Sequence, residues 1–174
     1  MKLMQTIHHY DVSIFTWVSQ RKSQKILVRI ARAISSSGNG PLYLVLAGML
    51  YWMGGAEKMQ LLTCMALALI IERPVYFVMK NAFKRDRPSV TLNTKSFVIP
   101  SDRFSFPSGH TSAAFLMATL YGWYFPALLP ALFTWATMVG MARVILGVHY
   151  PTDTAIGALM GISIALYSMG MILT

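Results

Sequence analysis

Three short clusters of basic, histidine and carboxylate residues lie at the ends of apolar segments in this chain of 174 residues. The clusters are Lys80 with Arg87, then Pro107-Ser108-Gly109-His110, then Arg143 with His149 and Asp153. Lysine and arginine bring positive charge, histidine exchanges protons near neutral pH, and a carboxylate can orient a histidine. Together these residue types favour chemistry on an anionic substrate.

A phosphoryl group is the ligand that best matches the positive charges. Lys80, Arg87 and Arg143 supply three cations, while the three clusters contain a single carboxylate. Arginine can bind two phosphate oxygens at once. Ser108 and Gly109 come directly before an apolar helix, so we expect backbone N–H groups and the positive helix end to face the same anion. Gly109 lets the backbone approach that anion closely.

The two histidines complete a predicted hydrolase. His149 and Asp153 are four residues apart, which allows the carboxylate to accept the Nδ1–H of His149 and leaves Nε2 as the nucleophile. His110 is placed to protonate the leaving oxygen as a general acid and then to take a proton from the attacking water. We expect no metal and no other cofactor, because the cations already supply the electrostatic stabilisation.

The composition indicates that lipid surrounds the elements that hold these residues. Charged residues make up 12% of the chain, against roughly 25% in soluble proteins, and hydrophobic residues make up 55%. Five apolar segments come close to the length of about 17–25 residues that a membrane-spanning helix needs. They are residues 41–56, 59–80, 110–126, 128–148 and 153–173.

Counting these segments places the three clusters on one side of the membrane. Segment 59–80 ends on one side, and segment 110–126 starts from the same side after the polar loop 81–109. Segment 128–148 returns to that side and segment 153–173 leaves from it. The sequence therefore predicts an active site formed by helix ends and the loop 81–109 on one membrane face.

The N-terminal region leaves the number of spans open. Within residues 10–37, Lys25, Arg29 and Arg32 lie opposite apolar residues at helical spacing, which favours an amphipathic interfacial helix over a sixth span. The apolar residues are Ile26, Leu27, Ile30, Ala33 and Ile34. The run from Ser35 to Pro41 predicts a helix end, a turn and a new helix. We expect an all-α bundle of five to six transmembrane helices in a single domain, residues 1–174.

The net charge of +9 is concentrated in two places. One group precedes the first long apolar segment: Lys2, Arg21, Lys22, Lys25, Arg29 and Arg32. The other lies in or beside the loop: Lys80, Lys84, Arg85, Arg87, Lys95 and Arg103. Basic residues beside membrane spans attract anionic headgroups, so this distribution argues against a nucleic-acid partner. We expect Lys84, Arg85, Lys95 and Arg103 to act as interfacial anchors, and Glu72 and Arg73 to form an ion pair between helices.

At these residues the chain resembles the type 2 phosphatidic acid phosphatase superfamily, which also includes glucose-6-phosphatase and the vanadium-dependent haloperoxidases. The family pattern is Lys, six residues, Arg-Pro; then Pro-Ser-Gly-His; then Ser-Arg, five residues, His, three residues, Asp. The three clusters meet this pattern, with Ala142 where the family often has serine. The resemblance implies that His149 is the nucleophile, Asp153 its orienting partner and His110 the acid. It implies that phosphate is bound by Lys80, Arg87, Ser108, Gly109 and Arg143.

The resemblance also implies a bacterial inner-membrane enzyme with its site at the periplasmic, outer face. Its substrate would be undecaprenyl diphosphate, phosphatidylglycerol phosphate or phosphatidate, with a slight preference for the first. In a five-span chain, the basic N-terminal segment would instead place the site on the cytoplasmic side. Two alternatives remain: a vanadate-dependent haloperoxidase, which the membrane spans weigh against, and a non-catalytic lipid-binding protein. The sequence does not predict an oligomeric state.

Overall fold

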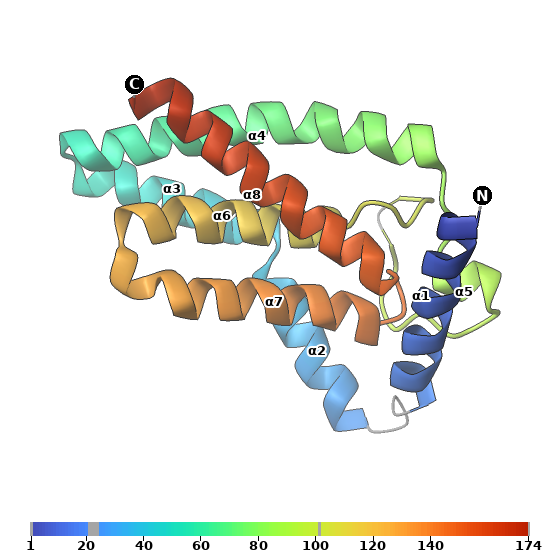
Figure 1. Cartoon of the computed structure of the whole chain (residues 1–174). Coiled ribbons are helices and arrows are strands. Elements are labelled where there is room, and N and C mark those ends of the chain that lie inside the picture. Colours follow the sequence, from blue (N-terminus) through green and yellow to red (C-terminus); the bar gives the residue numbers. More distant parts are fainter. Residues whose placement is uncertain (1, 21–24, 101, 174) are drawn as a thin grey trace.

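The computed structural model describes residues 2–20, 25–100 and 102–173, and every regular element in these ranges is a helix. In chain order they are α1 (Lys2–Gln20), α2 (Lys25–Ser37), α3 (Gly40–Met53), α4 (Ala56–Phe83), α5 (Pro88–Thr91), α6 (Gly109–Tyr124), the 3-10 turn η1 (Pro126–Leu128), α7 (Leu129–Ile145) and α8 (Pro151–Leu173). Figure 1 shows α3, α4, α6, α7 and α8 running along one another as a bundle, with the two chain ends at its opposite ends.

The five apolar segments of the sequence become the five helices of this bundle, with ends that shift by a few residues. Within the described ranges, three helical stretches are long and apolar enough to cross a membrane: Ala56–Thr91, Pro126–Ile145 and Pro151–Ile172. Helices α3 and α6 have 14 and 16 residues and are shorter. The predicted all-α bundle is confirmed, whereas the count of five to six spanning helices is not.

Helix α6 forms the centre of the bundle. It packs against α4, α7 and α8, and Ala114, Leu116, Ala118 and Leu120 along it are completely buried. A helix that is apolar on all sides belongs in an interior. The position of α6 therefore determines where its first residues, Gly109 and His110, are held.

Two glycines allow α6 and α8 to approach closely. A Cβ atom at Gly157 would lie 2.6 Å from the carbonyl oxygen of Ser108, and one at Gly161 would lie 2.1 Å from that of Ser112. Being four residues apart, the two glycines share one face of α8, as in close-packed membrane helices. The start of α6 therefore lies directly against α8.

The N-terminal region forms two helices rather than the single amphipathic helix expected within residues 10–37. Helix α1 lies across the end of the bundle, and α2 runs obliquely from it toward α3 (Figure 1). Helix α2 packs against α7 through Val28 and Ala31, whereas Ile26 and Ile30 are exposed. The residues that pack on protein are therefore offset from the exposed isoleucines, and the interfacial position of this helix stays a prediction. Arg21 and Lys22 lie outside the described residues.

The turn between α2 and α3 agrees with the prediction. Helix α2 ends at Ser37, and α3 begins at Gly40 with Pro41 in its first turn, where a missing N–H costs little. The hydroxyl of Tyr43 donates to the carbonyl of Gly38 at 3.1 Å. The turn lies beside the start of α6, where Asn39 reaches His110.

Candidate active site

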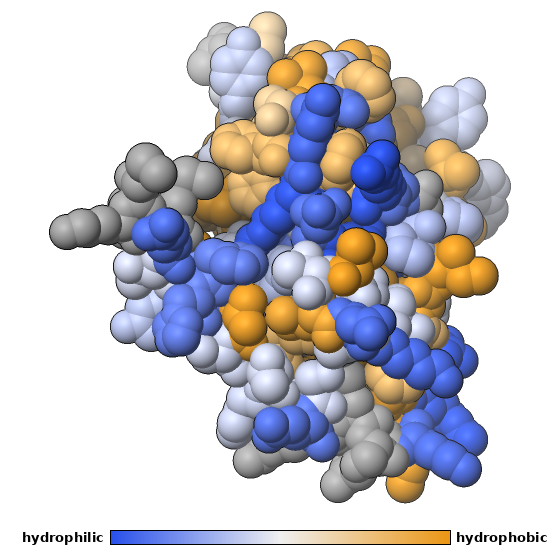
Figure 2. All heavy atoms as spheres, turned by 90° about the vertical axis from the view of Figure 1, so that its right-hand side faces the viewer, coloured by the Kyte–Doolittle hydropathy of each residue, from blue (hydrophilic) through white to orange (hydrophobic). Residues whose placement is uncertain are grey.

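The structure brings the three clusters together at one end of the bundle. Arg87 Nη1 donates to the carbonyl of Val148 at 2.6 Å, and the N–H of Ser108 donates to the carbonyl of Asp153 at 3.0 Å. The loop 81–109, which includes α5, covers this end. Figure 2 looks onto it and shows hydrophilic side chains gathered across the face, with apolar patches among them.

His149 lies in the turn between α7 and α8 and is 2% exposed. Its Nδ1 is 3.7 Å from Asp153 Oδ2, which is longer than a hydrogen bond. The predicted hydrogen bond between these side chains is therefore not formed. Asp153 Oδ2 instead accepts the N–H of Tyr150 at 2.8 Å, as an acidic residue in a first helical turn often does.

The surroundings of His149 favour its neutral form. Burial lowers the pKa of the imidazole to about 4, and the neighbouring Asp153 carboxylate opposes this effect only in part. A neutral imidazole keeps a lone pair on one ring nitrogen. His149 is therefore suited to act as a nucleophile near neutral pH.

Lys80 and Arg87 are both buried and share one carboxylate, that of Asp102. Lys80 Nζ lies 2.8 Å from Asp102 Oδ1, which Arg87 Nη2 also contacts, and the hydroxyl of Tyr76 donates to Asp102 Oδ2. Burial would raise the pKa of Asp102, but the donors Lys80 and Tyr76 outweigh it and lower the pKa to about 2. The Asp102 carboxylate thus pairs with two of the predicted phosphate-binding cations, Lys80 and Arg87.

Asp102 was not predicted. Its signal in the sequence is weak, because Asp102 is next to Arg103 in a basic loop. Neighbouring opposite charges in such a loop ordinarily form a solvent-exposed ion pair. Asp102 therefore adds a second carboxylate to the candidate site, beside the Asp153 of the three clusters.

Arg143 lies in the last turn of α7 and is 7% exposed. Its Nη1 donates to the hydroxyl of Ser35 on α2 at 2.8 Å. Its Nε is buried, and no hydrogen-bond partner for it occurs among the described residues. Because a buried donor left unpaired is costly, Arg143 retains capacity for an anionic ligand.

The second cluster differs in detail from the prediction. The N–H of Ser108 is already bonded to the carbonyl of Asp153, so it does not face an anion, and the Ser108 hydroxyl lies 2.9 Å from that of Thr111. At Gly109, a Cβ would come within 2.9 Å of the Tyr76 ring. Glycine therefore lets the Tyr76 ring pack closely here, and the closeness of Gly109 to a ligand remains a prediction.

His110 is held by a residue that was not predicted. Its Nε2 lies 3.0 Å from the side-chain oxygen of Asn39, in the turn before α3. An amide oxygen accepts a hydrogen bond from a ring N–H, so Nε2 of His110 carries the proton in this contact. The other ring nitrogen, Nδ1, is left for a different partner. Nothing in the sequence pattern connects two polar residues so far apart.

Arg85 is the clearest correction to the sequence analysis. It was expected to anchor the chain at the interface, yet its Nη1 lies 2.8 Å from Asp153 Oδ1 and its Nη2 lies 2.7 Å from Asp11 on α1. Lys84, Lys95 and Arg103 are exposed, in keeping with their predicted role. The two carboxylates that hold Arg85 are far from it in sequence, so only the fold brings them together.

The expected ion pair between helices at Glu72 and Arg73 is also wrong. The two residues are adjacent on α4 and pair with each other. The contact between helices is instead a hydrogen bond, in which the hydroxyl of Ser112 on α6 donates to Glu72 at 2.8 Å. Because Glu72 is fully buried, this bond helps satisfy a costly carboxylate.

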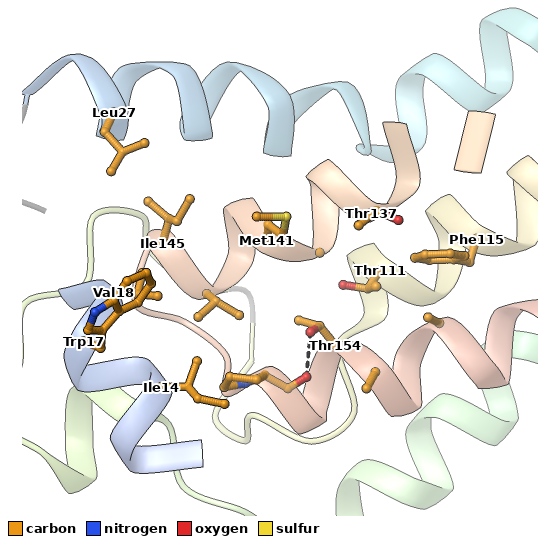
Figure 3. A pocket seen from close by; sticks show the side chains of 15 residues that line it. Ile14, Trp17, Val18, Leu27, Thr111, Phe115, Thr137, Met141, Ile145 and Thr154 are labelled. Atoms are coloured by element: carbon orange, nitrogen blue, oxygen red, sulfur yellow. Dashed lines mark hydrogen bonds between the residues drawn. The ribbon is translucent and has the colours of Figure 1, made fainter. Parts of the chain in front are cut away.

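Two cavities border the site. The larger, of about 840 Å³, lies between α3, α4 and α6 and runs from apolar residues such as Leu44, Leu62 and Leu69 to Tyr76 and His110. The smaller, of about 550 Å³, is lined by α1, α2, α6, α7 and α8, and Figure 3 shows its mostly apolar walls. Among the described residues, no three His, Cys, Asp or Glu side chains gather as a candidate metal site.

Known proteins resemble this chain in sequence and in fold. The model of the PAP2 superfamily matches residues 57–174. The bacitracin transport permease protein BcrC of Bacillus licheniformis is 31% identical over 134 residues, which cover 72% of this chain and 63% of BcrC. The putative undecaprenyl-diphosphatase YbjG of Escherichia coli strain K12 is 32% identical over 118 residues, which cover 67% of this chain and 60% of YbjG. These matches span less than two thirds of either relative.

The fold likeness extends beyond the matched region. The crystal structure of Aquifex aeolicus LpxE aligns with a TM-score of 0.81 and 26% identity, over 91% of this chain and 93% of LpxE. The likeness in fold therefore covers more of the chain than the residues 57–174 that the family model matches.

Proposed function

The chain belongs to the PAP2 superfamily and is an integral membrane protein, and from this premise we propose that it is a membrane lipid phosphatase. It hydrolyses a lipid phosphate monoester or diphosphate through a phosphohistidine intermediate. The observation that carries the proposal is His149, a buried neutral histidine beside the buried cations of the site. Those cations are Lys80, Arg87 and Arg143.

In the first step, Nε2 of His149 attacks the phosphorus while the bond from phosphorus to the leaving oxygen breaks. His110 donates a proton to that oxygen, which departs on the lipid alcohol or the lipid phosphate. Lys80, Arg87 and Arg143 balance the charge of the phosphoryl oxygens. Asp102 now occupies the contacts of Lys80 and Arg87, so a bound phosphate has to displace it.

In the second step, water attacks the phosphorus of the phosphohistidine. His110 accepts a proton from that water, the bond between phosphorus and Nε2 breaks, and inorganic phosphate leaves. Asp153 stabilises the imidazole of His149 while it carries the phosphoryl group. Ser108, through its hydroxyl, and Gly109, at the start of α6, complete the proposed phosphate-binding set.

The larger cavity supports a lipid substrate. Its apolar walls between α3 and α4 suit a hydrocarbon chain, and its polar end at His110 suits a phosphorylated headgroup. YbjG carries the name of an undecaprenyl-diphosphatase, and we propose undecaprenyl diphosphate as the first substrate to test. The membrane helices and this relative favour a phosphatase over a haloperoxidase or a non-catalytic lipid-binding protein.

Phosphate release from purified protein tests the function. Undecaprenyl diphosphate, phosphatidylglycerol phosphate and phosphatidate are supplied in detergent micelles, with a chelator present. We expect release from at least one lipid, and we expect His149→Ala to abolish it. An active wild-type enzyme whose activity survives His149→Ala would refute the phosphohistidine route, and no release from any lipid would refute the phosphatase.

We also propose that the membrane is the bacterial inner membrane and that the site opens to its outer face. The resemblance supports this orientation, whereas the exposed basic residues at the same end, such as Lys25, Arg29 and Lys95, favour the cytoplasmic side. The labelling experiment described in the Discussion separates the two.

A further inference from the structure

Helix α1 places a buried carboxylate next to the proposed catalytic pair. Asp11 is 1% exposed, and it lies outside the region that the family model matches. Its Oδ1 accepts the N–H of Thr152 at 2.9 Å, and its Oδ2 accepts the Thr152 hydroxyl. Thr152 lies between His149 and Asp153 in the chain. Asp11 on α1 therefore hydrogen-bonds to the first turn of α8.

Arg85 joins Asp11 to Asp153. One terminal nitrogen lies 2.7 Å from Asp11 Oδ2, and the other lies 2.8 Å from Asp153 Oδ1. The second nitrogen also donates to the Thr152 hydroxyl at 2.8 Å, and the guanidinium lies over the ring of Tyr150, 4.2 Å from its centre. The flat fork of arginine suits such a bridge, because its nitrogens are held at fixed angles.

Apolar contacts hold α1 where Asp11 can reach. Phe15, one turn after Asp11, is fully buried, and its ring centre lies 5.9 Å from that of Tyr150. On the neighbouring face of α1, Ile14, Trp17 and Val18 line the smaller cavity (Figure 3). Helix α1 is thus fixed against the turn that carries His149, with a charged group directed at Arg85.

We propose that Asp11 and Arg85 are positioning residues, which hold the Asp153 carboxylate at its place beside His149. The proposal rests on the phosphatase function given above. Asp153 makes no hydrogen bond to His149 in this structure, so its place is set by Arg85 and by the N–H of Tyr150. A small displacement of Asp153 would move its carboxylate away from the imidazole that it stabilises in the proposed mechanism, and a misplacement of about 1 Å can cost on the order of 100-fold in rate.

Asp11→Asn, Arg85→Lys and the double variant test the proposal, with Asp86→Asn as the matched control. Asp86 is an exposed carboxylate next to Arg85 in the chain. We expect Asp11→Asn and Arg85→Lys each to lower kcat by about 10- to 100-fold while KM changes by less than about threefold, because the phosphate-binding cations are untouched. The control should keep the wild-type kcat.

The double variant shows whether the two residues act as one unit. If Asp11 acts through Arg85, the double variant should be no slower than the worse single variant, since coupled residues are not additive. Size-exclusion chromatography in detergent establishes that each variant is folded. Should Asp11→Asn not fold, Arg85→Lys decides alone by its kcat.

The outcomes separate this proposal from the proposed function. An active wild type with an inactive His149→Ala, together with single variants whose kcat stays within twofold of wild type, would overturn the positioning role alone. Effects that multiply in the double variant, or a loss that appears in KM rather than in kcat, would also overturn it. An inactive wild type would instead remove the phosphatase function on which the proposal rests.

Discussion

At the scale of single residues, the candidate site contains several buried charged side chains. Lys80, Arg87, Arg143 and Asp153 are all less than a tenth exposed. Buried charges are costly unless they are paired, and here pairs from distant parts of the chain satisfy most of them. The exception is the Nε of Arg143, which has no hydrogen-bond partner among the described residues, and in the proposed mechanism a phosphoryl ligand supplies one.

The pH dependence of the reaction tests the burial of His149. In the proposed mechanism His149 attacks only when it is neutral, and burial lowers its pKa to about 4. Activity should therefore persist as pH falls through about 6.5, where an exposed histidine protonates, and decline only near pH 4. The measurement is kcat/KM against pH with two soluble phosphate esters of different phosphate pKa. A decline near pH 6.5 with both esters would contradict the prediction.

Asp102→Asn tests the competition between Asp102 and phosphate. The substitution removes the negative charge that Lys80 and Arg87 now contact, so phosphate should bind more tightly. We expect the inhibition constant of inorganic phosphate to fall by about tenfold, equivalent to ~1.4 kcal/mol. Asp86→Asn, an exposed neighbour in the same loop, is the control. An unchanged or higher constant would mean that Asp102 organises the cations rather than blocking them.

At the scale of elements, the N-terminal part of the chain contacts side chains of the candidate site. Asp11 on α1 contacts Arg85, Ser35 on α2 contacts Arg143, and Asn39 before α3 contacts His110. Asp11, Ser35 and Asn39 all precede the region that the family model matches. The bundle and the loop 81–109 supply the candidate site residues, and the N-terminal elements restrict how three of them are oriented.

The seam between α6 and α8 can be tested with Gly161→Ala. The added methyl would lie 2.1 Å from the carbonyl oxygen of Ser112, so the two helices must separate. Such overpacking costs about 1–3 kcal/mol, and it should lower the Tm in detergent and reduce activity by displacing His110. Gly48→Ala is the control, since a Cβ there meets no atom within 4 Å. Equal Tm values for the two variants would refute the close contact.

At the scale of the whole molecule, the N-terminal helix and the candidate site share one end of the bundle, and the C-terminus lies at the other (Figure 1). Most of the basic residues that the structure describes lie at this first end, in α2 and in or beside the loop 81–109. The same end must therefore serve both substrate phosphate and lipid headgroups, which is why charge alone does not settle the orientation.

Cysteine labelling in intact cells tests the orientation. Lys95→Cys in the loop and Glu57→Cys at the start of α4 are both exposed, and Cys64→Ala removes the buried native thiol. A membrane-impermeant maleimide should label position 95 in intact cells and position 57 only after permeabilisation. Labelling of both from one side would contradict the bundle topology. The reverse pattern would keep the topology and place the site on the cytoplasmic side.

Much of the fold could be predicted because its signals are local. Runs of apolar residues mark the helices, and Pro41 and Pro151 mark where two of them begin. The N-terminal region could not be predicted as well, because a helix such as α2 is apolar both where it packs on α7 and where Ile26 and Ile30 are exposed. Composition alone does not distinguish a protein neighbour from lipid.

The sequence by itself predicted the candidate reactive groups and that they lie together at one end of the bundle. Residue spacing and the number of apolar segments are enough for that, since each span reverses the side of the membrane. Only the tertiary structure decided how those groups are held. The deciding contacts join residues far apart in the chain, and include Asp11 with Arg85, Arg143 with Ser35, His110 with Asn39 and Lys80 with Asp102. Such pairs depend on how the helices pack against one another, and no local pattern in the sequence encodes which distant residues come into contact.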